Sequence, residues 1–202
     1  MTSRLVVSAF VSLDGVMQAP GGPGEDDDNG FKHGGWLAPH VDEGFNRIMG
    51  DQLDRADGML LGRRSYDILS SYWPHVSDED GGAEINSMPK YVATRSPMTA
   101  EWRNTEVLAG EAAQTVADLK RRTDGEIITQ GSSDLIRTLQ RAELVGEYRL
   151  MVFPVVLGEG KRMFAEGALP AGLKLTGCTT TDAGVVYMTY AWTGDPLYSS
   201  VA

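Results

Sequence analysis

The chain has little cysteine and little histidine: Cys178 stands alone, and three histidines are scattered among 202 residues. A lone cysteine excludes an intrachain disulfide, and the histidines lack the spacing of metal ligands, so we expect no metal site. Cys178 lies in a threonine-rich segment, where a small buried apolar residue is the expected role.

Basic residues and long apolar runs are also scarce. Eighteen lysines and arginines stand against 28 aspartates and glutamates, for a formal net charge of −10. Nucleic-acid binding depends on a basic surface that displaces counterions, so no nucleic-acid partner is expected. No run approaches a membrane span, and the first residues lead into a strand instead of a signal-peptide core. We therefore expect a cytoplasmic protein with no membrane partner.

The pattern of apolar residues predicts one α/β domain over residues 1–202. Residues 5–11 are almost continuously apolar and predict a buried strand, and a helical apolar face follows from Asp42. Strands and helices then alternate up to residue 139, which favours a largely parallel sheet flanked by helices. The end differs: a strand over residues 148–156 precedes strands at 173–181 and 185–192, which predict an antiparallel hairpin at the sheet edge.

A loop over residues 18–35 is rich in glycine, proline and aspartate and is long for a compact domain. Such a loop is either a functional lid or a disordered patch. Phe31, His33 and Trp36 are candidates for a lid over the substrate, although a surface flap without a role is the alternative. The acidic run 25–30 resembles the start of a calcium loop, but Trp36 stands where the closing glutamate is required.

Three predicted strands end in residues suited to bind phosphate: the first is followed by Gly62, the second ends at Thr94 and the third is followed by Gly131. Glycine lets the backbone approach a pyrophosphate, and serine or threonine can cap a helix or bind a phosphate oxygen. Each turn alone is also typical of an ordinary strand-to-helix connection. Because three occur together, with arginines on two, a dinucleotide is the simplest ligand that needs all of them.

Arginines follow two of these strands. A guanidinium group makes paired hydrogen bonds to a phosphate at constant charge, so Arg63, Arg64 and Arg95 could select NADPH over NADH. The alternative is solvated surface charge, which suits Arg64 better than the other two.

Five segments, in their order along the chain, give the sequence a resemblance to a known family. They are Ser-Leu-Asp-Gly (12–15), Leu-Gly-Arg-Arg-Ser-Tyr (61–66), Ala-Thr-Arg-Ser (93–96), Gln-Gly-Ser-Ser-Asp-Leu (130–135) and Pro-Val-Val-Leu-Gly-Glu-Gly-Lys-Arg-Met-Phe (154–164). The chain resembles the dihydrofolate reductase superfamily, and within it the RibD C-terminal type, the reductase domain of riboflavin biosynthesis and its stand-alone relatives. Essentially the whole chain takes part in this resemblance.

The resemblance implies a dihydrofolate-reductase-like fold with NADPH bound across the strand ends. By position, the residues that it implies for cofactor binding are Ser12, Val16, Met17, Gly62, Arg63, Arg64, Ser65, Thr94, Arg95, Ser96, Gly131, Ser132 and Ser133.

Hydride transfer to a C=N or C=O bond also needs a proton. Asp14 and Asp42 are the candidate catalytic carboxylates, with Trp36 and Phe31 as candidate substrate contacts. Asp14 could instead stabilise the turn before Gly15, and Asp42 could be a helix N-terminal charge. The spacing around Asp42 departs by one residue from that of true dihydrofolate reductases, which makes dihydrofolate a doubtful substrate.

The sequence therefore predicts a cytoplasmic NADPH-dependent reductase of a small heterocyclic or carbonyl substrate. It resembles the 5-amino-6-(5-phosphoribosylamino)uracil reductase of riboflavin biosynthesis, for whose ribose phosphate Lys161 and Arg162, after the glycine-rich turn, are the only candidate contacts. The alternatives are a dihydrofolate or pterin reductase and a non-catalytic NADPH-binding sensor. The resemblance also implies a homodimer with protected sheet edges.

Overall fold

The sheet is mixed and, as predicted, mostly parallel. The computed structural model describes residues 2–164 and 166–201, and for residue 80 the backbone only. In this part of the chain the eight strands are β1 (Arg4–Ser12), β2 (Gly58–Gly62), β3 (Lys90–Thr94), β4 (Thr105–Ala109), β5 (Glu126–Gln130), β6 (Glu147–Phe153), β7 (Gly172–Thr180) and β8 (Val186–Gly194). Their order is β4-β3-β2-β5-β1-β6-β8-β7. Strands β1 to β6 pair in parallel, whereas β8 pairs antiparallel with both β6 and β7.

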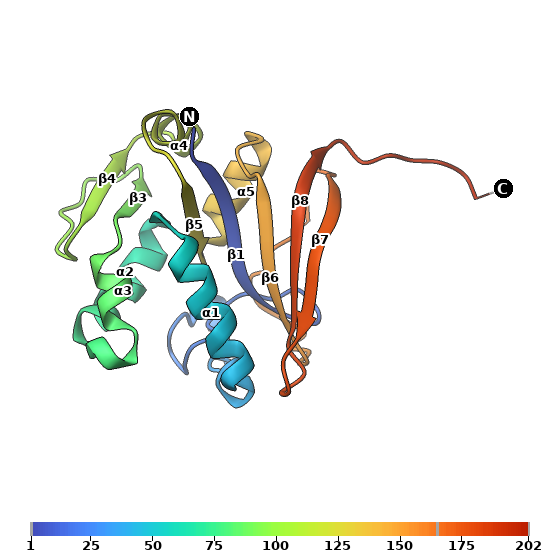
Figure 1. Ribbon diagram of the computed structural model, residues 1–202, viewed down its shortest axis with the longest axis horizontal. Coiled ribbons are helices and arrows are strands. Elements are labelled where there is room, and N and C mark those ends of the chain that lie inside the picture. Colours follow the sequence, from blue (N-terminus) through green and yellow to red (C-terminus); the bar gives the residue numbers. More distant parts are fainter. Residues whose placement is uncertain (1, 165, 202) are drawn as a thin grey trace.

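Helices follow most of the parallel strands (Figure 1). They are α1 (Glu43–Arg55), α2 (Arg63–Tyr72), α3 (Gly82–Ser87), α4 (Ala112–Arg122) and α5 (Ser133–Arg141), with short 3-10 turns at η1 (Asp28–Gly30), η2 (Ala38–His40), η3 (Trp73–His75) and η4 (Asp78–Asp80). None of the described helices has the length and apolar character needed to cross a membrane.

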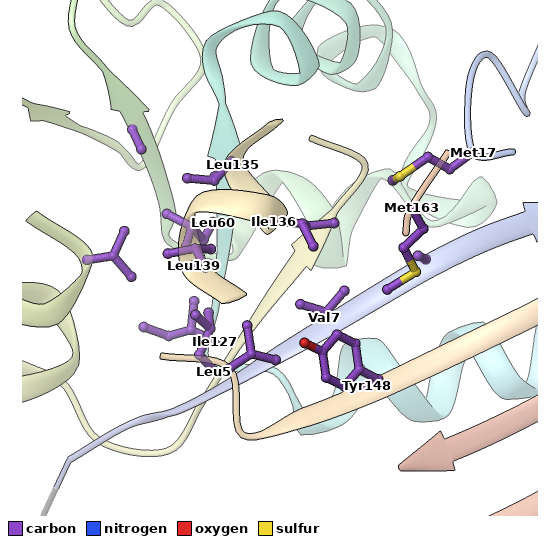
Figure 2. Packing of buried hydrophobic residues seen from close by; sticks show 14 of the residues in the cluster. Leu5, Val7, Met17, Leu60, Ile127, Leu135, Ile136, Leu139, Tyr148 and Met163 are labelled. Carbon is purple, nitrogen blue, oxygen red and sulfur yellow. The ribbon is translucent and has the colours of Figure 1, made fainter. Parts of the chain in front are cut away.

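The two faces of the sheet are covered by different helices. Successive strand residues point to opposite faces, so β1 presents Leu5 and Val7 to α4 and α5, and presents Ser8 and Phe10 to α1. Figure 2 shows the first of these layers, in which Leu135, Ile136 and Leu139 of α5 pack over Leu5, Val7, Leu60 and Ile127. A second layer holds Phe45 and Ile48 of α1 against Phe153.

The structure confirms the fold class and corrects several details. The terminal hairpin lies at the sheet edge as expected, with β7 outermost. Strand β6 ends at Phe153, three residues earlier than predicted, and the segment before Ser87 contains the short helix α3, where we expected only a surface excursion. Cys178 is exposed on β7, so the expectation that it is buried is wrong. An edge strand has no neighbour on its outer side to cover its side chains.

Lys90 is a fully buried cation without a carboxylate partner in the described part of the chain. Its Nζ donates hydrogen bonds to the carbonyls of Ile85, Asn86 and Met88 at the end of α3. The same nitrogen lies 4.5 Å from the ring centroid of Trp102. These contacts attach α3 to the start of β3. Burial lowers the pKa of Lys90 to about 8.

This burial predicts a pH-dependent stability. Between about pH 8 and 10.5 the folded protein holds Lys90 neutral while the unfolded chain still binds the proton. The free energy of unfolding should therefore gain up to about 1.4 kcal/mol per pH unit in this interval from Lys90 alone. Urea denaturation at pH 7, 8, 9 and 9.5 measures it. The variant Lys90→Met should lose this rise, whereas Lys174→Met, at an exposed position on β7, should keep it. Equal slopes for wild type and Lys90→Met would contradict the prediction.

Candidate functional site

A cavity of about 1440 Å³ opens at the carboxyl ends of the parallel strands. Its wall includes the last residue of each of three strands: Gly62 of β2, Thr94 of β3 and Gln130 of β5. These three strands are neighbours and run parallel, so their ends meet at one edge, as the sequence predicted. From there the cavity continues between α1 and α2. In open α/β sheets, ligands bind at this edge.

Two strand-to-helix turns pack directly against each other in the wall. The Gly62 N–H donates a hydrogen bond to Ser132 Oγ at 2.9 Å. A Cβ on Gly62 would lie 3.3 Å from this same oxygen, and a Cβ on Gly131 would lie 3.1 Å from Ser65 Oγ. Gly131 also has a φ of +67°, which favours glycine. The two glycines therefore let the β2–α2 and β5–α5 turns approach closely.

The starts of α2 and α5 both face this cavity. The residues before them, Gly62 and Ser132, make no side-chain hydrogen bond to the first turn of their helices. The N–H groups of an uncapped first turn carry partial positive charge and suit an anion. Ser65 and Ser133 lie in these first turns and add hydroxyl groups to the wall. The pair of helix starts thus forms a cradle that suits a pyrophosphate.

The three predicted arginines all line the cavity but differ in their partners. Arg63 makes an exposed ion pair with Asp67, one turn along α2. Arg64 makes ion pairs with Asp26 at 2.7 Å and Asp28 at 2.9 Å. Arg95 is exposed and has no ion-pair partner among the described residues. Arg95 is therefore the arginine whose charge remains available to a ligand, beside Thr94 and Ser96.

Four charged side chains hold the long loop in place. Lys161 Nζ lies 2.7 Å from both Asp26 and Asp28, and the same two carboxylates bind Arg64. Gln18 adds hydrogen bonds to the carbonyls of both aspartates and accepts one from the Lys161 N–H. The loop is thereby joined to α2 and to the connection that follows β6. In the acidic run that resembles a calcium loop, the charges of Asp26 and Asp28 are thus neutralised by the side chains of Arg64 and Lys161.

Asp14 was a candidate catalytic carboxylate, but it lies outside the cavity lining and binds backbone amides. It accepts hydrogen bonds from the Ser12 hydroxyl and from the N–H groups of Leu157 and Gly158, and it pairs with Arg162. The Ser12 hydroxyl, aided by the two amides, lowers the pKa of Asp14 to about 2. A carboxyl group with this pKa is ionised at neutral pH and is a poor proton donor.

Asp42 is the N-cap of α1 and also lies outside the lining. Its carboxylate accepts hydrogen bonds from the N–H groups of Phe45 at 2.7 Å and Ala183 at 2.8 Å. These bonds lower its pKa. The structure therefore gives Asp42 the helix-capping role that the sequence left as an alternative, and it joins α1 to the β7–β8 turn.

Of the predicted cofactor and substrate contacts near the loop, some line the cavity and others are buried outside its lining. Met17 lines the cavity, whereas Ser12, at the end of β1, and Val16, in the turn that follows, are buried and lie outside the lining. Phe31 and Trp36, expected in a lid over the substrate, are 7% exposed and pack inward. Trp36 donates to the Gln18 carbonyl and contacts Phe153 edge to face, and Phe31 packs with Val16 and Ala19. The two aromatic residues thus fix the loop and lie outside the cavity lining.

Several lining residues were missed from the sequence. Glu25 lines the cavity, and burial raises the pKa of its carboxyl group above the usual value. Its carboxylate accepts hydrogen bonds from the N–H groups of Gly21 and Gly22. We had assigned Glu25 to the acidic run only. Phe45 and Met49 of α1 also line the cavity, and their helical spacing predicted a buried face without distinguishing core from cavity.

Comparison with known proteins places this architecture in context. The profile of the RibD C-terminal domain matches residues 3–187. The Bacillus subtilis (strain 168) protein YyaP is 32% identical over 196 residues, which cover 95% of this chain and 96% of YyaP.

Two solved structures have the same fold. The first is the Thermotoga maritima diaminohydroxyphosphoribosylaminopyrimidine deaminase/5-amino-6-(5-phosphoribosylamino)uracil reductase, with a TM-score of 0.62 at 10% identity over 95% of this chain and 57% of that one. The second is Enterococcus faecalis dihydrofolate reductase complexed with NADP(H), with a TM-score of 0.58 at 13% identity over 95% of this chain and 99% of that one. The dihydrofolate-reductase-like fold expected from the sequence is confirmed.

The ion pairs of Arg64 predict how the loop responds to mutation. Arg64→Ala should release residues 18–35 from α2, because among the described residues Asp26 and Asp28 would keep only Lys161 as a cation partner. Amide hydrogen exchange across the loop should become about threefold to tenfold faster, as expected for the loss of partly exposed pairs. Arg63→Ala is the matched control, since it breaks only a pair within α2. Equal effects of the two variants on the loop would contradict this account.

Proposed function

Because this chain belongs to the RibD C-terminal domain family, we propose that it is an NADPH-dependent reductase of a small heterocyclic or carbonyl substrate. One observation carries the proposal: three parallel strand ends and two uncapped helix starts form one wall of a large cavity. This wall suits the phosphates of a dinucleotide. The fold, shared with a dihydrofolate reductase that binds NADP(H), supports the same cofactor.

We assign the cofactor to the wall residue by residue. Gly62, Arg63 and Ser65, with Gly131, Ser132 and Ser133, would hold the pyrophosphate at the two helix starts. Thr94, Arg95 and Ser96 would hold the adenosine side and its 2′-phosphate. Met17 would border the nicotinamide, and Ser12 and Val16 would support it from the buried turn behind. Arg64 is part of this wall but acts mainly through the loop that it anchors.

Bound NADPH would supply a hydride to the carbon of a C=N or C=O bond, and the heteroatom of that bond would need a proton. We propose Glu25 as the residue that delivers this proton, directly or through water. It is a half-buried carboxyl group in the cavity wall, whereas Asp14 and Asp42 lie outside the lining. The raised pKa of Glu25 favours the protonated form that an acid catalyst requires.

Dihydrofolate or a pterin is a less suitable substrate. That chemistry needs a carboxylate reaching into the cavity from the start of α1, and Asp42 uses both carboxylate oxygens for backbone amides. The adjoining turn of α1 presents Asn46 and Met49 to the cavity instead. A sensor without catalysis remains the alternative of a different class, and it would bind NADPH without oxidising it in the presence of any substrate.

The assignment of Arg95 predicts cofactor selectivity. Arg95→Ala should weaken NADPH binding about tenfold, which is typical of losing a charge-assisted contact to a phosphate, and should leave NADH binding nearly unchanged. Calorimetric titration of both cofactors measures the difference. Arg121→Ala, an exposed arginine of α4 outside the cavity lining, is the control. If NADPH affinity survives the loss of both Arg63 and Arg95, the cofactor assignment fails.

The assignment of Glu25 predicts a pH profile. The wild-type kcat/KM should fall as pH rises through the raised pKa of Glu25, because only the protonated group can donate. Glu25→Gln should lower kcat/KM about 100-fold at the optimum and remove this fall. Glu101→Gln, an exposed carboxyl group outside the lining, should change neither property. A Glu25→Gln variant that melts earlier but keeps the wild-type pH profile would show a role in loop structure alone.

A further inference from the structure

The cavity contains a second region that the proposed cofactor site does not use. We call it the α1–α2 groove. Its apolar wall is formed by Phe45, Met49 and Leu53 of α1, Leu69 and Tyr72 of α2, and Trp73. Tyr72 is 63% exposed, and its ring meets Trp73 edge to face at 5.5 Å. An apolar groove with accessible aromatic rings suits the body of an organic substrate.

The cations of the cavity lie in only one of its two regions. The described lining holds Arg63, Arg64, Arg95 and Lys161, all in the strand-end wall and its loop, where the carboxylates Glu25, Asp26, Glu111 and Asp134 also line the cavity. The charged side chains that line the groove in the described chain are all carboxylates: Asp54, Asp78, Glu79 and Glu84. They are exposed at its rim, and no described cation pairs with them. The groove is therefore negative at its mouth and apolar inside.

This division excludes a phosphate from the groove on electrostatic grounds. A phosphate monoester carries close to two negative charges at neutral pH and is held in proteins by arginine, lysine or helix starts. Here it would face like charges without a compensating cation, which weakens binding and slows encounter. An uncharged ligand avoids this repulsion. A cationic ligand is attracted both by the carboxylates and by the aromatic faces.

We propose that the substrate of this protein is a phosphate-free molecule with an apolar or aromatic body that is uncharged or cationic. The inference rests on the proposed function, because it takes the groove as the substrate part of a reductase cavity. It separates this chain from the Thermotoga maritima relative, whose name specifies a phosphoribosyl substrate. The shared fold would then serve a different substrate class, selected by the charge of the rim.

Three probes that share one aromatic ring test the proposal: benzyltrimethylammonium, benzyl alcohol and benzyl phosphate. Their dissociation constants are measured by ligand-observed NMR at low ionic strength on protein saturated with NADP+, so that the phosphate cradle is filled. We expect the ammonium probe to bind at least about tenfold more tightly than the phosphate probe, with the alcohol between them. Benzyl phosphate binding tightest, or none of the three binding at millimolar concentration, would overturn the proposal.

A charge variant assigns the preference to the groove. Asp54→Asn combined with Glu84→Gln should reduce the ratio of ammonium to phosphate affinity about threefold, as expected for two exposed charges. Asp182→Asn combined with Glu101→Gln is the matched control, because it removes the same net charge outside the lining. Equal effects of the two double variants would attribute the preference to overall charge and overturn the role of the groove.

The cofactor titration separates this inference from the proposed function. If neither NADP+ nor NADPH binds, the reductase proposal fails, and the three probes are then compared on the free protein, where their order still tests the groove. If NADPH binds and the phosphate probe is preferred, only the substrate class is wrong. Turnover then provides an independent comparison: 5-amino-6-(5-phosphoribosylamino)uracil should be a poorer substrate than its dephosphorylated counterpart. The reverse order would overturn the inference.

Discussion

The cavity depends on the close approach of two turns, one after β2 and one after β5. Gly62 and Gly131 lack the Cβ atoms that would press on Ser132 and Ser65, and the Gly62 N–H to Ser132 Oγ hydrogen bond joins the turns. Because β2 and β5 are paired in parallel, this contact brings the starts of α2 and α5 together at one edge of the sheet. The electropositive N–H groups of two helices are thereby concentrated on one wall.

A second constraint is electrostatic and concerns the loop over residues 18–35. A protein with a net charge of −10 would be expected to repel an anionic cofactor, and Glu25 and Asp26 of this loop line the cavity. Arg64 and Lys161 pair with Asp26 and Asp28, so these two carboxylates add little net charge beside the cradle. Arg95, which has no such partner in the described chain, supplies local positive charge. The arrangement reconciles an acidic chain with an anionic ligand.

Sequence patterns predicted the elements of this architecture better than the orientation of its side chains. Apolar periodicity located the strands, and glycine, serine and threonine at strand ends located the cradle. The same patterns could not show that the carboxylates of Asp14 and Asp42 accept hydrogen bonds from backbone amides. Nor could they show that the side chains of Phe31 and Trp36 are buried. Such roles depend on contacts between segments distant in sequence: Asp14 meets Gly158, and Asp42 meets Ala183. Helix α3 was missed because it is a short, polar segment whose Asn86 accepts a hydrogen bond from the indole N–H of Trp102, sixteen residues away.

The division of charge within the cavity follows from how the two regions are built. Backbone N–H groups and arginines gather where parallel strands end and helices begin, and the fold itself fixes this polarity. The groove is walled by side chains of α1, α2 and the segment up to α3, whose identities the fold does not dictate. Tyr72 and Glu84 could change without disturbing the sheet, because both side chains are exposed at the rim of the cavity. A family with this fold can therefore retain the cofactor wall while the substrate class follows the residues of the groove.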